Sequence, residues 1–165
     1  MDLQLPAVLA ANFAYQDDRF RAAPRTPRPA RRLAILTCMD ARLDLFRSLG
    51  LEVGDSHVLR NAGGRASEDA IRSLVVSTHL LGTREIGVVH HTDCGLEGLT
   101  DADVADRTGV RDIEFLTFAS VDESVRADVA AIRRCGPLPH GTVVWGAVYD
   151  VDTGGLRVIA EPQPV

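Results

Sequence analysis

The sequence predicts an α/β fold in which a mostly parallel central sheet is flanked by helices. Three observations lead to this prediction. Short runs at 33–37, 57–61 and 86–91 have the length and apolar character of buried parallel strands. The segments between them carry helix-capping residues, and a strand–helix–strand order is typical of parallel sheets with helices on their faces. The length of 165 residues suits one compact domain, 1–165.

The N-terminal segment, residues 1–23, is predicted to form a helical arm, because Phe13, Tyr15 and other apolar residues are spaced among polar ones. Residues 24–32 follow as a linker rich in proline and arginine, which we expect to be extended. Such a helix has little reason to fold back on a small domain. We therefore expect it to pack on something larger, in a homodimer or a tetramer.

The elements after the linker alternate regularly. The helices are recognised by a capping serine or by a glycine that ends them. The expected elements are a strand at 33–37, a helix at 41–49 closed by Gly50, a strand at 57–61, a helix from Ser67 to Leu81 ended by Gly82, and a strand at 86–91.

Beyond the third strand the pattern is less regular. Residues 97–108 are acidic and are expected to be irregular, and 111–118 is expected to form a short helix. Apolar residues at helical spacing predict a longer helix at 121–135, which the run GPLP at 136–139 stops. The last segment predicts two strands joined by a hairpin turn at 152–155, where aspartate and glycines suit a tight turn.

Composition and charge exclude several classes of protein. The net charge of -5 argues against a nucleic-acid binder, which needs a basic face. The sequence has no apolar run of about 18 residues, so no membrane span is expected. The N-terminus lacks the basic segment of a secretory signal, and we expect a cytoplasmic protein. The three cysteines are then reduced and available for metal binding or catalysis.

Two cysteines and one histidine are expected to meet at one edge of the sheet. Cys38 lies one residue past the first strand, and His91 and Cys94 lie at the end of the third strand. Ligands of parallel sheets bind at the carboxyl ends of strands, so the three converge if those strands are neighbours. Two thiolates and one imidazole suit zinc and leave a fourth position open. The alternative is two ordinary buried cysteines and a core histidine, but their places directly after apolar strands favour a metal.

An acid and a guanidinium follow the first of these cysteines. Arg42 can keep Asp40 ionised and orient it through a two-pronged hydrogen bond. Asp40 can then accept a hydrogen bond from a metal-bound water. It can also turn to the metal and take the fourth position itself, which closes the site. In a third interpretation Asp40 caps the next helix and Arg42 is a surface charge.

Three motifs together resemble the landmark segments of one enzyme family. CMDAR (38–42), RNAGG (60–64) and HHTDCG (90–95) match, in order and approximate spacing, those of the β-class carbonic anhydrases, within their short bacterial branch. The resemblance is strong over roughly residues 30–100 and covers the remainder only in outline. It implies an α/β sheet that dimerises, with the N-terminal helix reaching over the partner subunit.

The resemblance also implies a site and a reaction. It implies one zinc ion per chain on Cys38, His91 and Cys94, with Asp40 and Arg42 as the catalytic pair beside it. The activity implied is that of a lyase (carbonate dehydratase), which hydrates carbon dioxide reversibly to bicarbonate and a proton. In that mechanism, zinc-bound hydroxide attacks the carbon of CO₂.

The substrate pocket departs from the family pattern. Pro29 stands where the best-known members have glutamine, His57 stands where they have an aromatic residue, and Asp93 is less usual than a small residue. His57 is also the nearest candidate for a proton relay. His90 should point to the opposite side of its strand and is expected to be structural. The pocket is expected to be lined by His57, Asn61, Ala62, Gly63 and Gly64.

Because of these departures, the sequence leaves two alternatives to CO₂ hydration open. Relatives with similar metal sites hydrolyse carbonyl sulfide or carbon disulfide, so a hydrolase using the same zinc site is the first alternative. The second alternative is a non-catalytic regulatory or structural module, in which Asp40 permanently closes the zinc site.

Overall fold

The computed structural model describes residues 4–18 and 26–165. The predictions for residues 1–3 and 19–25, which belong to the arm and the start of the linker, lie outside this part of the chain. The described elements, in chain order, are α1 (Leu5–Asp18), β1 (Leu33–Cys38), α2 (Leu45–Ser48), β2 (Ser56–Asn61), the 3₁₀ turn η2 (Ala62–Gly64), α3 (Glu68–His79), β3 (Glu85–His91), α4 (Asp101–Thr108), α5 (Val121–Arg133), β4 (Val143–Tyr149) and β5 (Leu156–Pro164).

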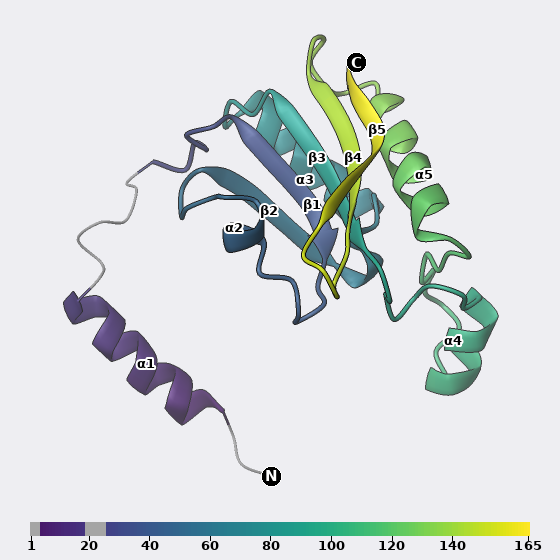
Figure 1. Ribbon diagram of the computed structural model, residues 1–165, viewed down its shortest axis with the longest axis horizontal. Coiled ribbons are helices and arrows are strands. Elements are labelled where there is room, and N and C mark those ends of the chain that lie inside the picture. The colour runs from purple at the N-terminus through teal and green to yellow at the C-terminus, as the bar shows by residue number, and fades with distance from the viewer. Residues whose placement is uncertain (1–3, 19–25) are drawn as a thin grey trace.

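The described strands form one mostly parallel sheet, and this confirms the predicted α/β fold (Figure 1). Their order is β2-β1-β3-β4-β5. β1 pairs in parallel with both β2 and β3, and β3 pairs in parallel with β4. β5 runs antiparallel to β4 and forms the expected hairpin with it. Since β1 and β3 are neighbours, their carboxyl ends lie side by side, as the convergence of Cys38 and His91 requires.

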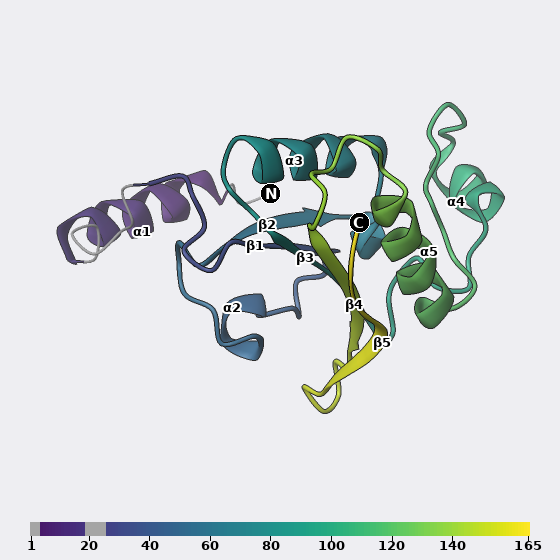
Figure 2. The same ribbon diagram turned by 90° about the horizontal axis from the view of Figure 1, so that it is seen from above.

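Helices cover the two faces of the sheet unequally (Figure 2). α3 and α5 lie on one face and α2 lies on the other. Strand alternation sends Leu36 and Val88 into the large core under α3 and α5, and sends Ile35 and Val89 into a smaller cluster with α2. The second face therefore has the thinner cover.

The two longer helices that cover the sheet, α3 and α5, follow the predicted pattern closely. The Ser67 hydroxyl accepts a hydrogen bond from the backbone of Ala70 and caps α3, as expected. Gly82 has a φ of 84°, which suits a glycine that ends a helix. In α5, Val121, Val125, Val129 and Ile132 are all buried, so these residues, which are spaced at helical intervals, form the face of α5 that packs on the core.

The predicted helix at 41–49 is wrong for its first half, because α2 begins only at Leu45. The guanidinium of Arg60 donates to the backbone oxygens of Cys38, Asp40 and Leu43 at 2.9, 2.6 and 3.3 Å. A side chain therefore engages these carbonyls, and a single turn, in which the backbone nitrogen of Leu43 donates to Asp40, stands where the helix was expected. Asp44 caps the short helix that remains.

The predictions for 97–108 and 111–118 are also wrong. Residues 101–108 form α4, which begins with a capping box between Thr100 and Asp103. The expected helix at 111–118 is absent from the described structure. The carboxylate of Asp101 instead accepts hydrogen bonds from the backbone of Phe115 and Thr117, and these bonds hold the segment in a non-helical form.

The helix of the N-terminal arm carries exposed apolar side chains. Leu9 and Phe13 of α1 are 59% and 69% exposed. Figure 1 shows α1 apart from the sheet. Within residues 4–18 and 26–165, no helix has both the length and the apolar content to cross a bilayer.

Candidate metal centre

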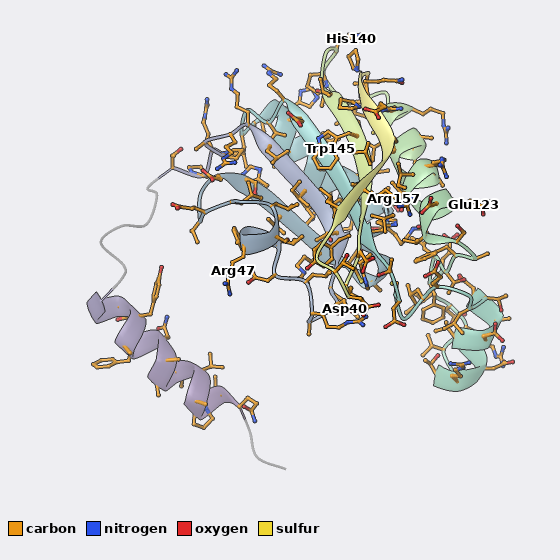
Figure 3. All side chains as sticks on the ribbon, in the orientation of Figure 1. Asp40, Arg47, Glu123, His140, Trp145 and Arg157 are labelled. Carbon is orange, nitrogen blue, oxygen red and sulfur yellow. The ribbon has the colours of Figure 1, made fainter. Side chains whose placement is uncertain are left out.

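Three potential ligands meet at the carboxyl edge of the sheet. Cys38 is the last residue of β1, His91 is the last residue of β3, and Cys94 lies in the turn that follows β3. All three are buried, and their ligand atoms lie within 4.8 Å of one another. The two sulfur atoms are 4.0 Å apart. Figure 3 labels the neighbouring Asp40 at this lower end of the sheet.

The ring of His91 is oriented toward the two thiols. Its Nδ1 lies 2.8 Å from the backbone oxygen of Thr92, and a carbonyl can only accept, so Nδ1 carries the proton. In the neutral ring Nε2 is then a bare acceptor. It is buried and has no hydrogen-bond partner among the described residues. Because an unpaired buried acceptor is costly, this atom together with two sulfurs fits a bound cation.

The two thiols do not ionise together. The hydrogen bond from Cys94 holds the pKa of Cys38 well below its usual value, although burial opposes the thiolate. The same bond raises the pKa of Cys94, and burial raises it further. Burial opposes protonation of His91, but the neighbouring Cys38 thiolate and the backbone oxygen of Thr92 favour the protonated ring and raise its pKa. A divalent cation at this point would favour the thiolate form of both cysteines and the neutral imidazole.

The carboxylate of Asp40 is held beside these groups by Arg42. Nε and Nη2 of Arg42 donate to Oδ1 and Oδ2 of Asp40 at 3.0 and 2.8 Å, which is the expected two-pronged bond. These bonds hold the pKa of Asp40 well below its usual range, so the carboxylate is charged. Its Oδ2 lies 3.9 Å from Nε2 of His91. Asp40 is therefore within reach of any water or metal held by the three ligands.

The turn after β2 packs directly against the first ligand. Gly64 has a φ of 72°, and a Cβ at this position would lie 2.9 Å from the backbone nitrogen of Cys38. Only glycine permits this approach without strain. His90 holds the turn from the other side, since its Nε2 donates to the backbone oxygen of Gly64 at 3.0 Å. The predicted structural role of His90 agrees with its burial and with this bond.

A buried ion pair supports this histidine. Arg65 donates to Asp128 at 2.7 and 3.2 Å, and the side chains of both are at most 12% exposed. Nε2 of His90 lies 3.3 Å from the same carboxylate, and the hydroxyl of Ser124 lies 3.0 Å from Nδ1. Although burial raises the pKa of Asp128, the bonds from His90 and Arg65 outweigh it and lower that pKa. The metal edge thus rests on a charged network inside the core.

Known proteins share this fold and a substantial part of this sequence. The family model for carbonic anhydrases matches residues 33–112. The β-carbonic anhydrase 1 of Mycobacterium tuberculosis (strain H37Rv) is 43% identical over 136 residues, which cover 79% of this chain and 83% of that protein. The crystal structure of a carbonic anhydrase from Streptococcus mutans superposes with a TM-score of 0.87 at 43% identity, covering 96% of this chain and 99% of the other.

The chain belongs to the β-class carbonic anhydrase family. The members of this family are lyases. The proteins similar to this chain also include a hydrolase. A carbon disulfide hydrolase of Acidianus sp. (strain A1-3) is 35% identical over 156 residues, which cover 77% of this chain and 76% of that protein.

The carbonic anhydrase fold leaves a cavity of about 270 Å³ beside the two cysteine ligands. Of the expected pocket residues, Ala62 and Gly63 line it. Gly64 packs behind it against Cys38, and the amide of Asn61 is engaged with the backbone of Arg65. The cavity is lined by Cys38, Met39, Asp40, Ala62, Gly63, Cys94, Gly95 and Leu96.

His57 is not part of this cavity, which corrects the expectation from the motif. It pairs with Ala34, at the opposite end of β2 from Asn61. Its Nε2 donates to the backbone oxygen of Pro27 at 2.8 Å, and its Nδ1 lies 2.7 Å from the hydroxyl of Ser77. Asn61, which pairs with Cys38 at the metal edge, is four residues further along β2, about 13 Å at the usual rise, so His57 cannot pass a proton to the site directly.

Several residues that shape the site were not singled out in the sequence. Leu96 and Met39 supply apolar walls, but nothing in their spacing identifies them. Asp128 does have a signal, because it falls on the apolar face of α5 between Val125 and Ile132. An acid at such a position must be paired if the helix is buried, so it could have been recognised as part of a buried network.

Proposed function

We propose that this chain catalyses the reversible hydration of carbon dioxide to bicarbonate and a proton, with one zinc ion held by Cys38, His91 and Cys94. The observation that carries the proposal is the buried Nε2 of His91, which has no hydrogen-bond partner in the described part of the chain and lies near two thiols and an ionised Asp40. The similarity to β-carbonic anhydrase 1 of M. tuberculosis supports the same reaction. Two thiolates and an imidazole leave one position of a tetrahedral zinc for water.

A zinc ion in this site supplies the acidity that turns water into a nucleophile near neutral pH. The residues of the chain determine where that water lies. Asp40, kept ionised by Arg42, accepts its hydrogen bond and so fixes the direction of the oxygen lone pair. The bonds from Arg60 to the carbonyls of Cys38 and Asp40 keep the loop that carries both residues in place.

The cavity beside the ligands suits a small apolar substrate. Ala62, Leu96 and Met39 contribute apolar surface next to Cys38 and Asp40. CO₂ has no hydrogen-bond donor, so it can enter an apolar cavity without leaving a donor unpaired.

A hydrolase of carbon disulfide or carbonyl sulfide is the second candidate. It is favoured by the carbon disulfide hydrolase of Acidianus among the relatives. Both reactions need the same activated water and an apolar pocket. A regulatory or structural zinc module is the third candidate, and it requires Asp40 to leave Arg42 for the metal. The three hydrogen bonds from Arg42 to Asp40 argue against such a permanently closed site.

Turnover of CO₂, carbonyl sulfide and carbon disulfide by the same purified protein separates these candidates. We expect CO₂ hydration to have the highest kcat/KM, by at least about tenfold. Zinc content is measured on the same sample. Brisk sulfide release with negligible CO₂ hydration would make the chain a hydrolase. No turnover of any of the three by fully zinc-loaded protein, even at alkaline pH, would make it a non-catalytic module.

We also propose that the protein is a homodimer or a tetramer in which α1 packs on a partner subunit. Its exposed Leu5, Val8, Leu9 and Phe13 form an apolar surface on α1. The sheet face that α2 covers has half-buried Trp145 and Tyr149 at its margin, and it offers such a surface a place to pack. A zinc site with two cysteine ligands needs reduced thiols, which the cytoplasm maintains, so we propose a cytoplasmic location.

Sedimentation at micromolar concentration tests the assembly. The full chain should sediment with at least twice its own mass. The double variant Leu9→Asp, Phe13→Asp should shift toward the monomer, because two charges on the buried face oppose association. Ala14→Glu is the control, because the helical spacing places Ala14 on the opposite side of α1 from Leu5, Leu9 and Phe13, and it should leave the assembly unchanged. A monomeric wild-type chain would contradict the proposal.

A further inference from the structure

Asp93, in the turn after β3, binds the guanidinium of Arg42, which lies in the loop after β1. Nη1 of Arg42 donates to Oδ2 of Asp93 at 2.7 Å, and Nη2 donates to the backbone oxygen of Asp93 at 2.9 Å. Within the described residues, Asp40 and Asp93 are the hydrogen-bond partners of this guanidinium. Arg42 therefore ties the loop of Cys38 to the loop of His91 and Cys94.

The backbone of Asp93 is shaped for this contact. Its φ of 55° lies in the left-handed region, which aspartate, asparagine and glycine adopt most readily. The conformation directs both the carbonyl and the carboxylate of one residue at one guanidinium. Asp93 lies between two of the proposed zinc ligands, so its position is coupled to theirs.

The consequence of this contact concerns Asp40. Oδ2 of Asp40 accepts from Nη2 of Arg42 at 2.8 Å, and the same oxygen is 3.9 Å from Nε2 of His91. It thus has two competing partners, the guanidinium and a metal held by His91. Whatever fixes the guanidinium favours the first partner. With side chains 47% and 80% exposed, the Arg42–Asp93 pair adds little to the stability of the fold, so its effect on Asp40 can be isolated.

We propose that Asp93 is a positioning residue that holds the guanidinium of Arg42 and thereby keeps Asp40 turned away from the metal, leaving the fourth position free. This inference rests on the zinc site proposed above and is independent of which substrate the site hydrates. Loss of the Asp93 side chain loosens Arg42, and Asp40 then occupies the metal position for a larger fraction of the time. A ligand that needs the fourth metal position then binds more weakly, in proportion to the fraction of time that Asp40 occupies this position.

Azide binding to the full-length protein loaded with cobalt(II) tests this role through visible absorption, without an activity measurement. Asp93→Gly keeps the left-handed backbone and removes the carboxylate, and Asp93→Asn keeps an acceptor oxygen but removes the charge. The matched control is Asp106→Ala, which deletes the exposed partner of Arg111, a pair that is also 2.7 Å long. We expect the apparent Kd for azide to rise about two- to fivefold in Asp93→Gly.

The controls separate position from charge. Removing a negative charge near the site strengthens the binding of an anion, so Asp93→Asn should bind azide as well as wild type or better. Asp106→Ala should match wild type, and all four proteins should unfold at nearly the same temperature. Equal azide constants in Asp93→Gly and Asp106→Ala would overturn the role of Asp93 alone. Absence of a thiolate-to-cobalt absorption band in wild type would overturn the zinc site, and this inference with it.

Discussion

Replacing Cys38 with serine should abolish zinc binding and CO₂ hydration while the chain stays folded. A serine hydroxyl has nearly the shape of the thiol, but it does not ionise near neutral pH and is a poor zinc ligand. Two ligands from one loop, His91 and Cys94, then remain. We expect zinc affinity to fall by more than about 100-fold and activity to fall below about 1% of wild type. Zinc content, hydration rate and circular dichroism are measured on one preparation.

Cys135→Ser is the matched control for this prediction. Cys135 is a free cysteine at the end of α5, outside the ligand cluster, so its substitution should change neither zinc content nor rate. If Cys38→Ser unfolds the chain instead, the zinc ion is structural rather than catalytic. If it retains zinc and wild-type activity, Cys38 is not a ligand.

Asp128→Ala should strongly destabilise the fold, although Asp128 is not one of the proposed zinc ligands. It leaves the guanidinium of Arg65, with only 12% of the side chain exposed, without its carboxylate inside the core. Breaking one partner of a buried pair costs about 3–5 kcal/mol in the free energy of unfolding. His90 loses the same carboxylate, so the turn that packs on Cys38 should loosen as well. Denaturant unfolding of the zinc-loaded protein measures the cost.

The pH dependence gives this prediction a second check. The pKa of Asp128 is lower in the folded protein than in the unfolded chain. Its contribution to stability is therefore complete above the unfolded pKa, about 3.9, and is lost as pH falls through the folded pKa. The difference between wild type and Asp128→Ala should be full at pH 7 and shrink below pH of about 4. A loss under about 1 kcal/mol at pH 7, similar to Asp106→Ala, would show that the network is dispensable.

The sequence predicted the parts of the fold and site that depend on local pattern. Apolar runs and capping residues located β1, β3, α3 and α5 to within a few residues. The convergence of Cys38, His91 and Cys94 followed from one general rule, that the carboxyl ends of neighbouring parallel strands share an edge. Asp40 and Arg42 are only two residues apart, so their bond needed no tertiary information.

The remaining features depend on contacts between distant segments. Arg60 replaces the start of a helix at 41–44, and Asp101 does the same at 115–117, because side chains far along the sequence take the backbone groups that a helix would use. His57 was assigned to the pocket from its place near a motif, but the length of β2 carries it to the other end of the sheet. The hold of Asp93 on Arg42 spans 51 residues and has no local signal.

The central claim is that two sulfurs and one nitrogen of this chain bind a single zinc ion with a fourth position open to water. X-ray absorption at the zinc edge, on protein purified without added chelator, tests it most directly. We expect one zinc per chain, with two sulfur neighbours at about 2.3 Å and two nitrogen or oxygen neighbours at about 2.0–2.1 Å. A protein without stoichiometric zinc, or a zinc ion without two sulfur neighbours, would contradict the claim.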